Sequence, residues 1–264
     1  MSRDYLVTVM NDTLDTCDDY FYTNENNKGV EIKREDIITP IKKTVKVTTK
    51  DITEQPTLLP HPCEIIIVNN DCLDIGLQLK DQGFNPVVLN MASMTRPGGG
   101  YMTGARAQEE SLFRRSNLYQ CLNEELYPIN FSEALYTPNA VIIKNSKYRY
   151  YDDYKKMSFI ACPAYRIKTV DDFNEYVKNT TAKKIKLMLD IGLKYGHDAI
   201  VLSAFGCGAY HNPVTAIAKL FKKIIYDGKY NYYYKTIIFA IIDDNNAISN
   251  NSEGNFAPFS KVFN

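Results

Sequence analysis

The residues best suited to chemistry lie between positions 98 and 110. Three consecutive glycines, Gly98, Gly99 and Gly100, are followed after seven residues by Gln108 and two glutamates. A loop without Cβ atoms lets its backbone N–H groups approach a phosphate or a sugar closely. The two adjacent carboxyl groups can supply acid–base chemistry beside such a loop. This segment therefore predicts proton transfer to or from a ligand that contains phosphate or sugar.

The spacing of this segment resembles the signature of poly(ADP-ribose) glycohydrolases. The flanking sequences RPGGGY, GARAQEESL and RRSNLY are similar to the microbial branch of that family. An alternative without catalysis is a glycine turn before a helix whose exposed face pairs Glu110 with Arg114 at i,i+4. That alternative explains neither Gln108 nor the three glycines together. The resemblance implies an exo-acting enzyme that cuts ribose–ribose O-glycosidic bonds and releases ADP-ribose.

The resemblance also implies roles for the residues of this site. Glu110 is expected to protonate the leaving oxygen and then to activate water. Glu109 is expected to hold substrate hydroxyls, and its charge, together with partial burial, would raise the pKa of Glu110. Gln108 is expected to fix the loop by hydrogen bonds. Asn90, eight residues before Gly98, would position the reacting ribose; the alternative is a strand-end residue bonded to a loop backbone.

A second glycine-rich segment, SAFGCGAYHNP at residues 203–213, is similar to the diphosphate loop of macrodomains, which are ADP-ribose-binding α/β/α modules. The residues expected to cradle the diphosphate are Gly206, Cys207, Gly208 and Ala209. Tyr210 would pack on the distal ribose, or alternatively lie in the core. Cys207 is interpreted as a small spacer, because nothing in its sequence context suggests a reactive thiolate.

Asp71 is the candidate for adenine recognition, because macrodomains often carry an acidic residue after the first core strand. It is equally well placed as the N-cap of the next helix, and both interpretations stay open. Arg114 and Arg115 are expected to pair with glutamates on the surface of their helix. The tyrosine-rich stretch 145–156 predicts a solvated hairpin or insertion, preferably a surface loop without a role in the chemistry.

The elements that position these residues alternate along the chain. Buried strands are predicted at 64–68, 86–91, 158–162, 199–204 and 236–243, with an edge strand at 140–144. Helices are predicted at 5–14, 71–82, 105–119, 170–195 and 213–226, with Asp71 and Asn212-Pro213 at N-terminal caps. The alternation predicts the fold class α/β, a three-layer α/β/α sandwich with a mixed, largely parallel central sheet and an N-terminal helical extension. The resemblance implies that this sandwich is macrodomain-like. Both glycine loops follow predicted strands, so they should form a cleft at one edge of the sheet.

Length and composition favour one core with an elaboration. The chain has 264 residues, of which 45% are apolar and 12% aromatic. We expect residues 1–60 to form an extension that packs on the core and residues 61–264 to form the macrodomain-like catalytic domain. Lysine plus arginine and aspartate plus glutamate both number 31, so nothing indicates sequence-specific binding of nucleic acid. A polyanionic substrate would have to be held by a local site.

The patterns of cysteine, histidine and apolar residues argue against disulfide-bonded, zinc-binding and membrane-spanning proteins. The six cysteines form no CxxC pair and read as reduced thiols, and the three histidines offer no set of zinc ligands. We therefore expect no metal and no cofactor. The sequence shows neither a signal peptide nor a membrane span, which predicts a cytoplasmic or nuclear protein that does not bind membranes. The expected partners are poly(ADP-ribose) or ADP-ribose, and ADP-ribosylated proteins as substrates.

Two other functions stay open on the same fold. One is hydrolysis of a mono-ADP-ribosyl linkage, and the other is non-catalytic binding of ADP-ribose. The second is disfavoured because a reader of ADP-ribose does not need both Glu109 and Glu110.

Overall fold

A mixed seven-stranded sheet forms the centre of the molecule in the computed structural model, which describes residues 1–53, 56–243, 245–250 and 252–264. The strand order is β3-β6-β7-β5-β8-β9-β4. The strands of this sheet are β3 (Val45–Thr48), β4 (Ile65–Val68), β5 (Pro86–Met91), β6 (Glu133–Lys144), β7 (Tyr150–Cys162), β8 (Ala199–Leu202) and β9 (Thr236–Ala240). From β7 to β4 all neighbours are parallel, whereas β6 is antiparallel to both β3 and β7. The expected mixed, largely parallel sheet is confirmed.

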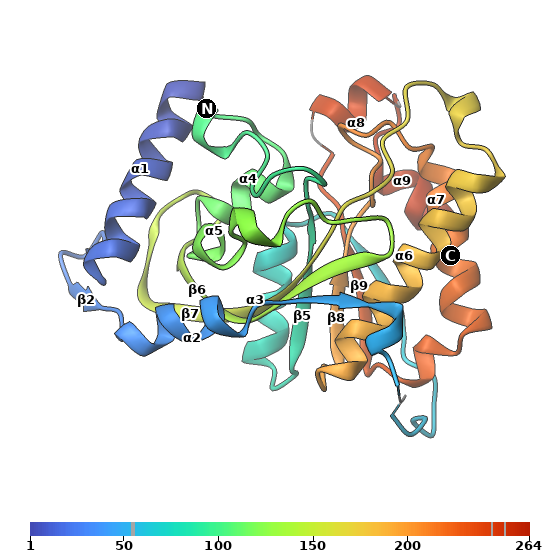
Figure 1. Ribbon diagram of the computed structural model, residues 1–264, viewed down its shortest axis with the longest axis horizontal. Helices are drawn as coiled ribbons and strands as arrows, with labels where there is room; N and C mark the ends of the chain where they lie inside the picture. The colour runs from blue at the N-terminus through green and yellow to red at the C-terminus, as the bar shows by residue number, and fades with distance from the viewer. Residues whose placement is uncertain (54–55, 244, 251) are drawn as a thin grey trace.

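Helices cover both faces of this sheet, which gives the expected three layers (Figure 1). One face carries α3 (Cys72–Asp81), α4 (Gln108–Phe113) and α5 (Leu118–Cys121). The other carries α6 (Glu175–Lys194), α7 (Val214–Asp227) and α9 (Phe256–Phe263). Side chains of β5 alternate between the layers, because successive residues of a strand point to opposite faces. Val87 and Leu89 pack toward α6, and Val88 packs toward α3.

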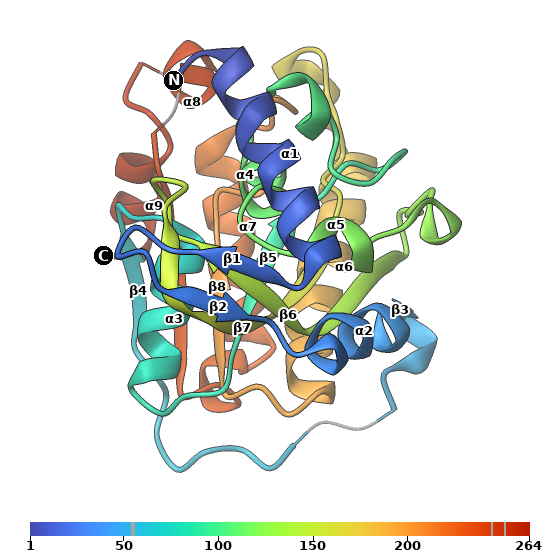
Figure 2. The same ribbon diagram turned by 90° about the vertical axis from the view of Figure 1, so that its left-hand side faces the viewer.

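The N-terminal segment lies over the side of the molecule that carries β6 (Figure 2). Its elements are α1 (Arg3–Asp19), β1 (Phe21–Thr23), β2 (Gly29–Glu31) and α2 (Arg34–Lys43). The β1–β2 hairpin packs through Tyr22 and Val30 on Val141 and Ile143 of β6. This segment also supplies β3, the edge strand of the central sheet. The division of the chain at residue 60 stays a prediction.

Shorter elements complete the described chain. They are α8 (Asn245–Asn250) and 3₁₀ helices at Thr49–Asp51, Tyr101–Thr103, Glu124–Leu126, Val170–Asp172 and Tyr230–Tyr232. None of the helices in the described ranges is long and apolar enough to cross a bilayer.

The predicted helix at 105–119 is wrong in extent. The chain leaves the helical path after α4, where Ser116 forms a β-bridge with Ile142 and the Asn117 N–H donates to the Val141 carbonyl. Pairing with β6 therefore replaces the helical hydrogen bonds at this point. For the same reason residues 140–144 are not an edge strand: they belong to β6 and pair with β7, and Ile142 also forms the bridge with Ser116.

Two further sequence predictions differ in detail. Strand β7 begins at Tyr150, eight residues before the predicted start at 158, because it pairs with β6 along a long hairpin. A hairpin at 145–156 was expected, and this part is confirmed. Pro213 occupies the N-cap position of α7 without a side-chain hydrogen bond, and Asn212 does not cap this helix.

Candidate active site

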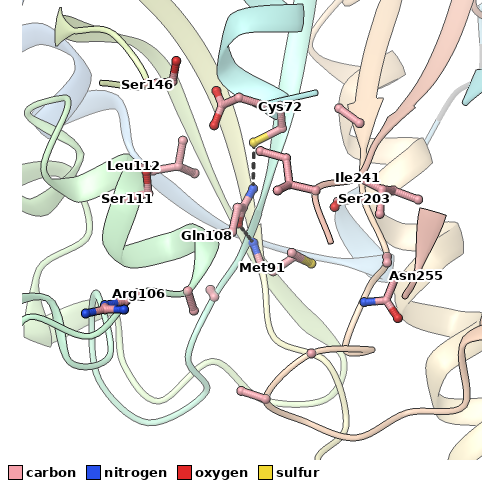
Figure 3. Close-up of a pocket in the computed structure, with 18 of the residues that line it drawn as sticks. Cys72, Met91, Arg106, Gln108, Ser111, Leu112, Ser146, Ser203, Ile241 and Asn255 are labelled. Atoms are coloured by element: carbon pink, nitrogen blue, oxygen red, sulfur yellow. Dashed lines mark hydrogen bonds between the residues drawn. The ribbon is translucent and has the colours of Figure 1, made fainter. Parts of the chain in front are cut away.

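A cavity of about 440 Å³ opens at the carboxyl ends of β4, β5, β8 and β9. Ligands bind at this end of parallel sheets because the loops that leave the strands converge there. In Figure 3, Met91 and Gln108 lie between Arg106 on one side and Ser203 and Asn255 on the other. Six of the residues predicted for the site line this cavity: Asp71, Gln108, Gly206, Gly208, Ala209 and Tyr210.

Gln108 ties the start of α4 to the end of β5. Its Oε1 accepts a hydrogen bond from the Met91 N–H at 2.8 Å, and its Nε2 donates to the Leu89 carbonyl. The same Nε2 lies 3.1 Å from the Cys72 Sγ at the start of α3 (Figure 3). These bonds fix the two glutamates that follow Gln108 relative to the sheet.

Glu109 is almost completely buried, and both of its carboxyl oxygens have hydrogen-bond partners. Its Oε2 accepts from the Ser93 N–H at 2.7 Å, and its Oε1 lies 3.4 Å from the Asn90 Nδ2. Burial, followed by the charge of Glu110, raises the pKa of Glu109 to about 8. The raised pKa expected at Glu110 stays a prediction, whereas the raised pKa that burial produces at Glu109 is a property of a side chain only 3% exposed. Asn90 is itself fully buried at the end of β5, and its Oδ1 has no partner among the described residues.

Glu110 lies against the glycine loop. Its Oε1 accepts from the Gly100 N–H at 3.1 Å, and its buried Oε2 has no hydrogen-bond partner in the described part of the chain. At Gly99 the backbone has a φ of +53°, and an added Cβ would lie 2.7 Å from the Glu110 Oε1. At Gly98 an added Cβ would lie 2.3 Å from the Phe113 ring. The absence of side chains thus lets this loop pack directly on α4 and on the catalytic candidate.

The two glutamates lie beside the cavity rather than in its wall. Met91 and Gln108 line the cavity, while Gly99 and Gly100 line a separate hollow of about 260 Å³. Burial raises the pKa of Tyr210, and the charges of Glu109 and Glu110 raise it further. Both carboxyl groups are held next to the cavity, because Gln108 lines it and directly precedes them.

The second glycine-rich loop forms the opposite part of the wall. Gly206, Gly208 and Ala209 reach the cavity, but Cys207 is 1% exposed and packs into the core. Burial raises the pKa of the Cys207 thiol, which agrees with a spacer rather than a nucleophile. Asn212 holds the loop from within, because its Nδ2 donates to the carbonyls of Gly206, Tyr210 and Tyr165.

The comparisons with known proteins agree with this geometry. The family model described as microbial-type PARG, catalytic domain, matches residues 10–155. The chain belongs to this family. A search of curated protein sequences finds no significant match.

Solved structures of bacterial members share the fold. Poly(ADP-ribose) glycohydrolase from Thermomonospora curvata is 20% identical, with a TM-score of 0.85 over 98% of this chain and 99% of that chain. Its complex with the inhibitor ADP-HPD gives 21% identity and a TM-score of 0.81 over the same shares, 98% and 99%. The Deinococcus radiodurans enzyme in complex with ADP-ribose is 20% identical, with a TM-score of 0.73 over 86% of this chain and 96% of that chain.

In this member of the PARG family, Asp71 both caps α3 and borders the cavity. Its Oδ1 accepts from the N–H groups of Leu73 and Asp74, each at 3.0 Å, and from the Arg115 Nη1 at 2.8 Å. The Arg115 Nη2 binds the Asp74 carboxylate at 2.6 Å. The N-cap interpretation is confirmed, and the arginine clamp orients the same carboxylate at the cavity wall.

The expected surface pairing of Arg114 and Arg115 is wrong, because both side chains are fully buried. The Arg114 guanidinium donates to the carbonyls of Leu6 and Ala105, and so binds α1 to the segment that precedes α4. The chain turns out of the helical path after Phe113, which directs both guanidinium groups inward instead of along an exposed helix face.

Several cavity residues were not predicted from the sequence. They include Ser146 and Tyr148 in the β6–β7 turn, and Ser203 and Asn255 on the far side. The tyrosine density of 145–156 was the available signal for the first pair, although a surface loop without a role was preferred. No motif marks Asn255. Within the described ranges, no group of three or more histidine, cysteine, aspartate or glutamate residues could hold a metal ion.

Proposed function

We propose that this chain removes ADP-ribose units from the end of poly(ADP-ribose), with Glu110 as the acid and base. Membership of the microbial-type PARG family makes it a glycosidase of poly(ADP-ribose), and the relatives with bound ADP-ribose or ADP-HPD support the same ligand here. The exo-acting mode and the role of each residue are our proposal. ADP-ribosylated proteins would then be the macromolecular substrates.

The assignment rests on a difference in hydrogen bonding between the carboxyl groups of Glu109 and Glu110. Both oxygens of Glu109 already accept hydrogen bonds, from Asn90 and Ser93. Only one oxygen of Glu110 is so engaged, and its Oε2 has no partner among the described residues. A group that must meet the leaving oxygen needs a free oxygen atom, so we assign proton transfer to Glu110 and positioning to Glu109.

The two carboxyl groups have different parts in the proposed reaction. Burial raises the pKa of Glu109 to about 8, so its carboxyl stays protonated at neutral pH and places no negative charge beside the acid. The proton that reaches the substrate must be carried by Glu110 itself. Glu110 delivers a proton to the leaving oxygen, the sugar passes through an oxocarbenium-like state, and the resulting carboxylate activates water. The usual glycosidase layout places the two carboxyls on opposite sides of the bond, whereas here they are adjacent in sequence. We assign part of the stabilisation of the cationic sugar to the substrate's own diphosphate.

We assign the second glycine-rich loop to the diphosphate of ADP-ribose. Gly206, Gly208 and Ala209 expose backbone at the cavity wall, where they would cradle the diphosphate. Tyr210 would face the distal ribose, because it directly follows this loop and lines the cavity. Asp71 lies in the wall at the start of α3, and we assign it to the adenine.

A comparison of Glu110→Gln with Glu125→Gln tests this proposal. The amide keeps the size of the side chain but cannot transfer the proton, and general acid–base catalysis contributes about 10²- to 10⁴-fold. We expect Glu110→Gln to lose that factor in kcat on labelled poly(ADP-ribose), about 3–6 kcal/mol, while ADP-ribose still binds. Glu125, an exposed glutamate outside the site, is the control and should keep full activity.

Two results would contradict the proposal. Turnover by Glu110→Gln above about a tenth of wild type would place the acid elsewhere. Early products of wild type that are oligomers, and not ADP-ribose, would contradict the exo-acting mode.

A further inference from the structure

Three aromatic side chains that are distant in sequence meet at the surface next to the site. Phe131 stacks on Tyr165 with ring centroids 5.0 Å apart and an angle of 18° between the rings. Tyr176 contacts the same ring edge-on at 6.3 Å. Phe131 is 38% exposed and Tyr176 is 63% exposed. We call these three residues the aromatic platform.

The aromatic platform is connected to both walls of the site. On the Phe131 side, the Ile129 N–H donates to the Met94 carbonyl at 2.9 Å. Met94 follows Ser93, whose N–H holds the Glu109 carboxyl. The platform therefore begins where the segment that positions the glutamates reaches the surface.

On its other side the platform joins the second glycine-rich loop. The Tyr165 carbonyl accepts from the Asn212 Nδ2 at 2.7 Å, and this amide also holds the Gly206 carbonyl. Ala164, directly before Tyr165, lines the cavity. The stacked pair of Phe131 and Tyr165 thus lies just outside the Tyr210 end of the cavity.

Charges of both signs lie around the platform, and the carboxylates of Glu133 and Glu175 already pair with Lys46 and Lys178. Lys184 of α6 lies beneath it, with its Nζ 5.5 Å from the centre of the Phe131 ring. This lysine is fully buried, and its Nζ has no hydrogen-bond partner within the described ranges. Arg166 and Lys168 are exposed beside Tyr165. The nearby Asp172 carboxylate already accepts from the N–H groups of Lys168 and Thr169.

We propose that the aromatic platform binds the adenine of the next ADP-ribose unit, on the leaving side of the bond that is cut. This inference rests on the proposed function. The leaving oxygen in poly(ADP-ribose) belongs to an adenosine ribose, so its adenine lies one sugar away from Glu110. A base stacks on exposed aromatic rings through its π face, and the diphosphate of the same unit would meet Arg166 and Lys168.

The test compares two substrates in the double variant Phe131→Ala/Tyr176→Ala. One substrate is long poly(ADP-ribose), and the other is ADP-ribose joined through its reacting carbon to methanol, which has no adenine on the leaving side. We expect KM for the polymer to rise about 10-fold, while kcat/KM for the methyl glycoside is unchanged. Phe131→Trp should keep the wild-type KM for the polymer, because tryptophan preserves stacking.

The matched control is Tyr226→Ala, an exposed tyrosine in the last turn of α7, which should leave both substrates unaffected. An unchanged polymer KM in the double variant would overturn the inference, as would an equal loss on both substrates. A loss confined to release of single ADP-ribose units from modified proteins would assign the platform to the carrier protein and also overturn it. Wild-type protein that cleaves neither substrate would instead contradict the proposed function itself.

Discussion

Glu109 keeps its proton to unusually high pH because burial removes the water that would solvate its charge. Its folded-state pKa of about 8 lies above the value of 4.5 expected in an unfolded chain. The folded protein therefore binds more protons than the unfolded chain between these two values. The stabilisation from this proton is complete below about pH 4.5 and is lost progressively up to about pH 8.

We accordingly predict that wild type loses stability relative to Glu109→Gln as the pH rises. The difference between the two free energies of unfolding should shift by about 1.4 kcal/mol for each pH unit in this window. Urea unfolding of both proteins at pH 5 and pH 8 measures it, and the variant cancels the contributions of all other groups. A difference that is equal at both pH values would show that Glu109 is not protonated in the folded protein.

Gly99 is also important as a single residue, because it has no Cβ. An alanine Cβ there would lie 2.7 Å from the Glu110 Oε1, so Gly99→Ala should displace the carboxyl group and reduce kcat at least 10²-fold. Gly196 is the matched control, because its φ of +74° is also positive but an added Cβ would meet nothing within 4 Å. Gly196→Ala should cost about 1 kcal/mol of stability and no activity. Equal activity of the two variants would mean that the loop does not hold Glu110.

Among the elements, α3 and the end of β6 are joined by the buried Arg115, which follows α4, rather than by apolar packing alone. The Arg115 guanidinium binds Asp71 and Asp74 of α3 and the carbonyl of Lys144. It thereby fixes the carboxylate that we assign to adenine. Removing a buried arginine from such a network destabilises the fold, because the carboxylates of Asp71 and Asp74 then lack a compensating positive charge.

Arg115→Ala should therefore lower the free energy of unfolding by about 3 kcal/mol and also weaken ADP-ribose binding. Arg149→Ala is the comparison, because Arg149 is exposed and pairs with Glu25 at 3.4 Å; that substitution should cost less than about 1 kcal/mol. Urea unfolding and calorimetric titration with ADP-ribose measure both effects. Similar stabilities of the two variants would show that the clamp contributes no more than a surface pair.

For the whole molecule, the cavity wall is built from both halves of the chain. Asp71 and Gln108 come from one half, and Gly208 and Ala209 from the other. A ligand that contacts both halves binds only the assembled fold, so its binding energy adds to the free energy of unfolding. ADP-ribose at 100 times its dissociation constant should stabilise the protein by about 2.7 kcal/mol.

A thermal shift assay with ADP-ribose measures this stabilisation. Ala209→Asp provides the control, because Ala209 is exposed at the cavity wall and a carboxylate there would repel the diphosphate. We expect this variant to unfold at the wild-type temperature without ligand and to show no shift with it. A wild-type protein without a shift at millimolar ADP-ribose would contradict the site.

The sequence by itself determined the features that depend on neighbours along the chain. Runs of β-branched residues predicted β4, β5 and β8, and Asp71 predicted the start of α3, because strand burial and helix capping are local properties. The glycines and the Gln108-Glu109-Glu110 run indicated the family, since their spacing is fixed within one short segment. Gln108 and Asp71 then proved to line one cavity.

Only the tertiary structure decided which side chains are buried and which distant residues meet. Arg115 looked like a surface residue of a long helix, but pairing of residues 116 and 117 with β6 ended the helix and turned it inward toward Asp71. Burial raises the pKa of Glu109 for the same kind of reason, because desolvation depends on every segment packed around a group. Phe131 and Tyr165 became a stacked pair through contacts across the fold. Such contacts join residues far apart in sequence, so no local pattern specifies them.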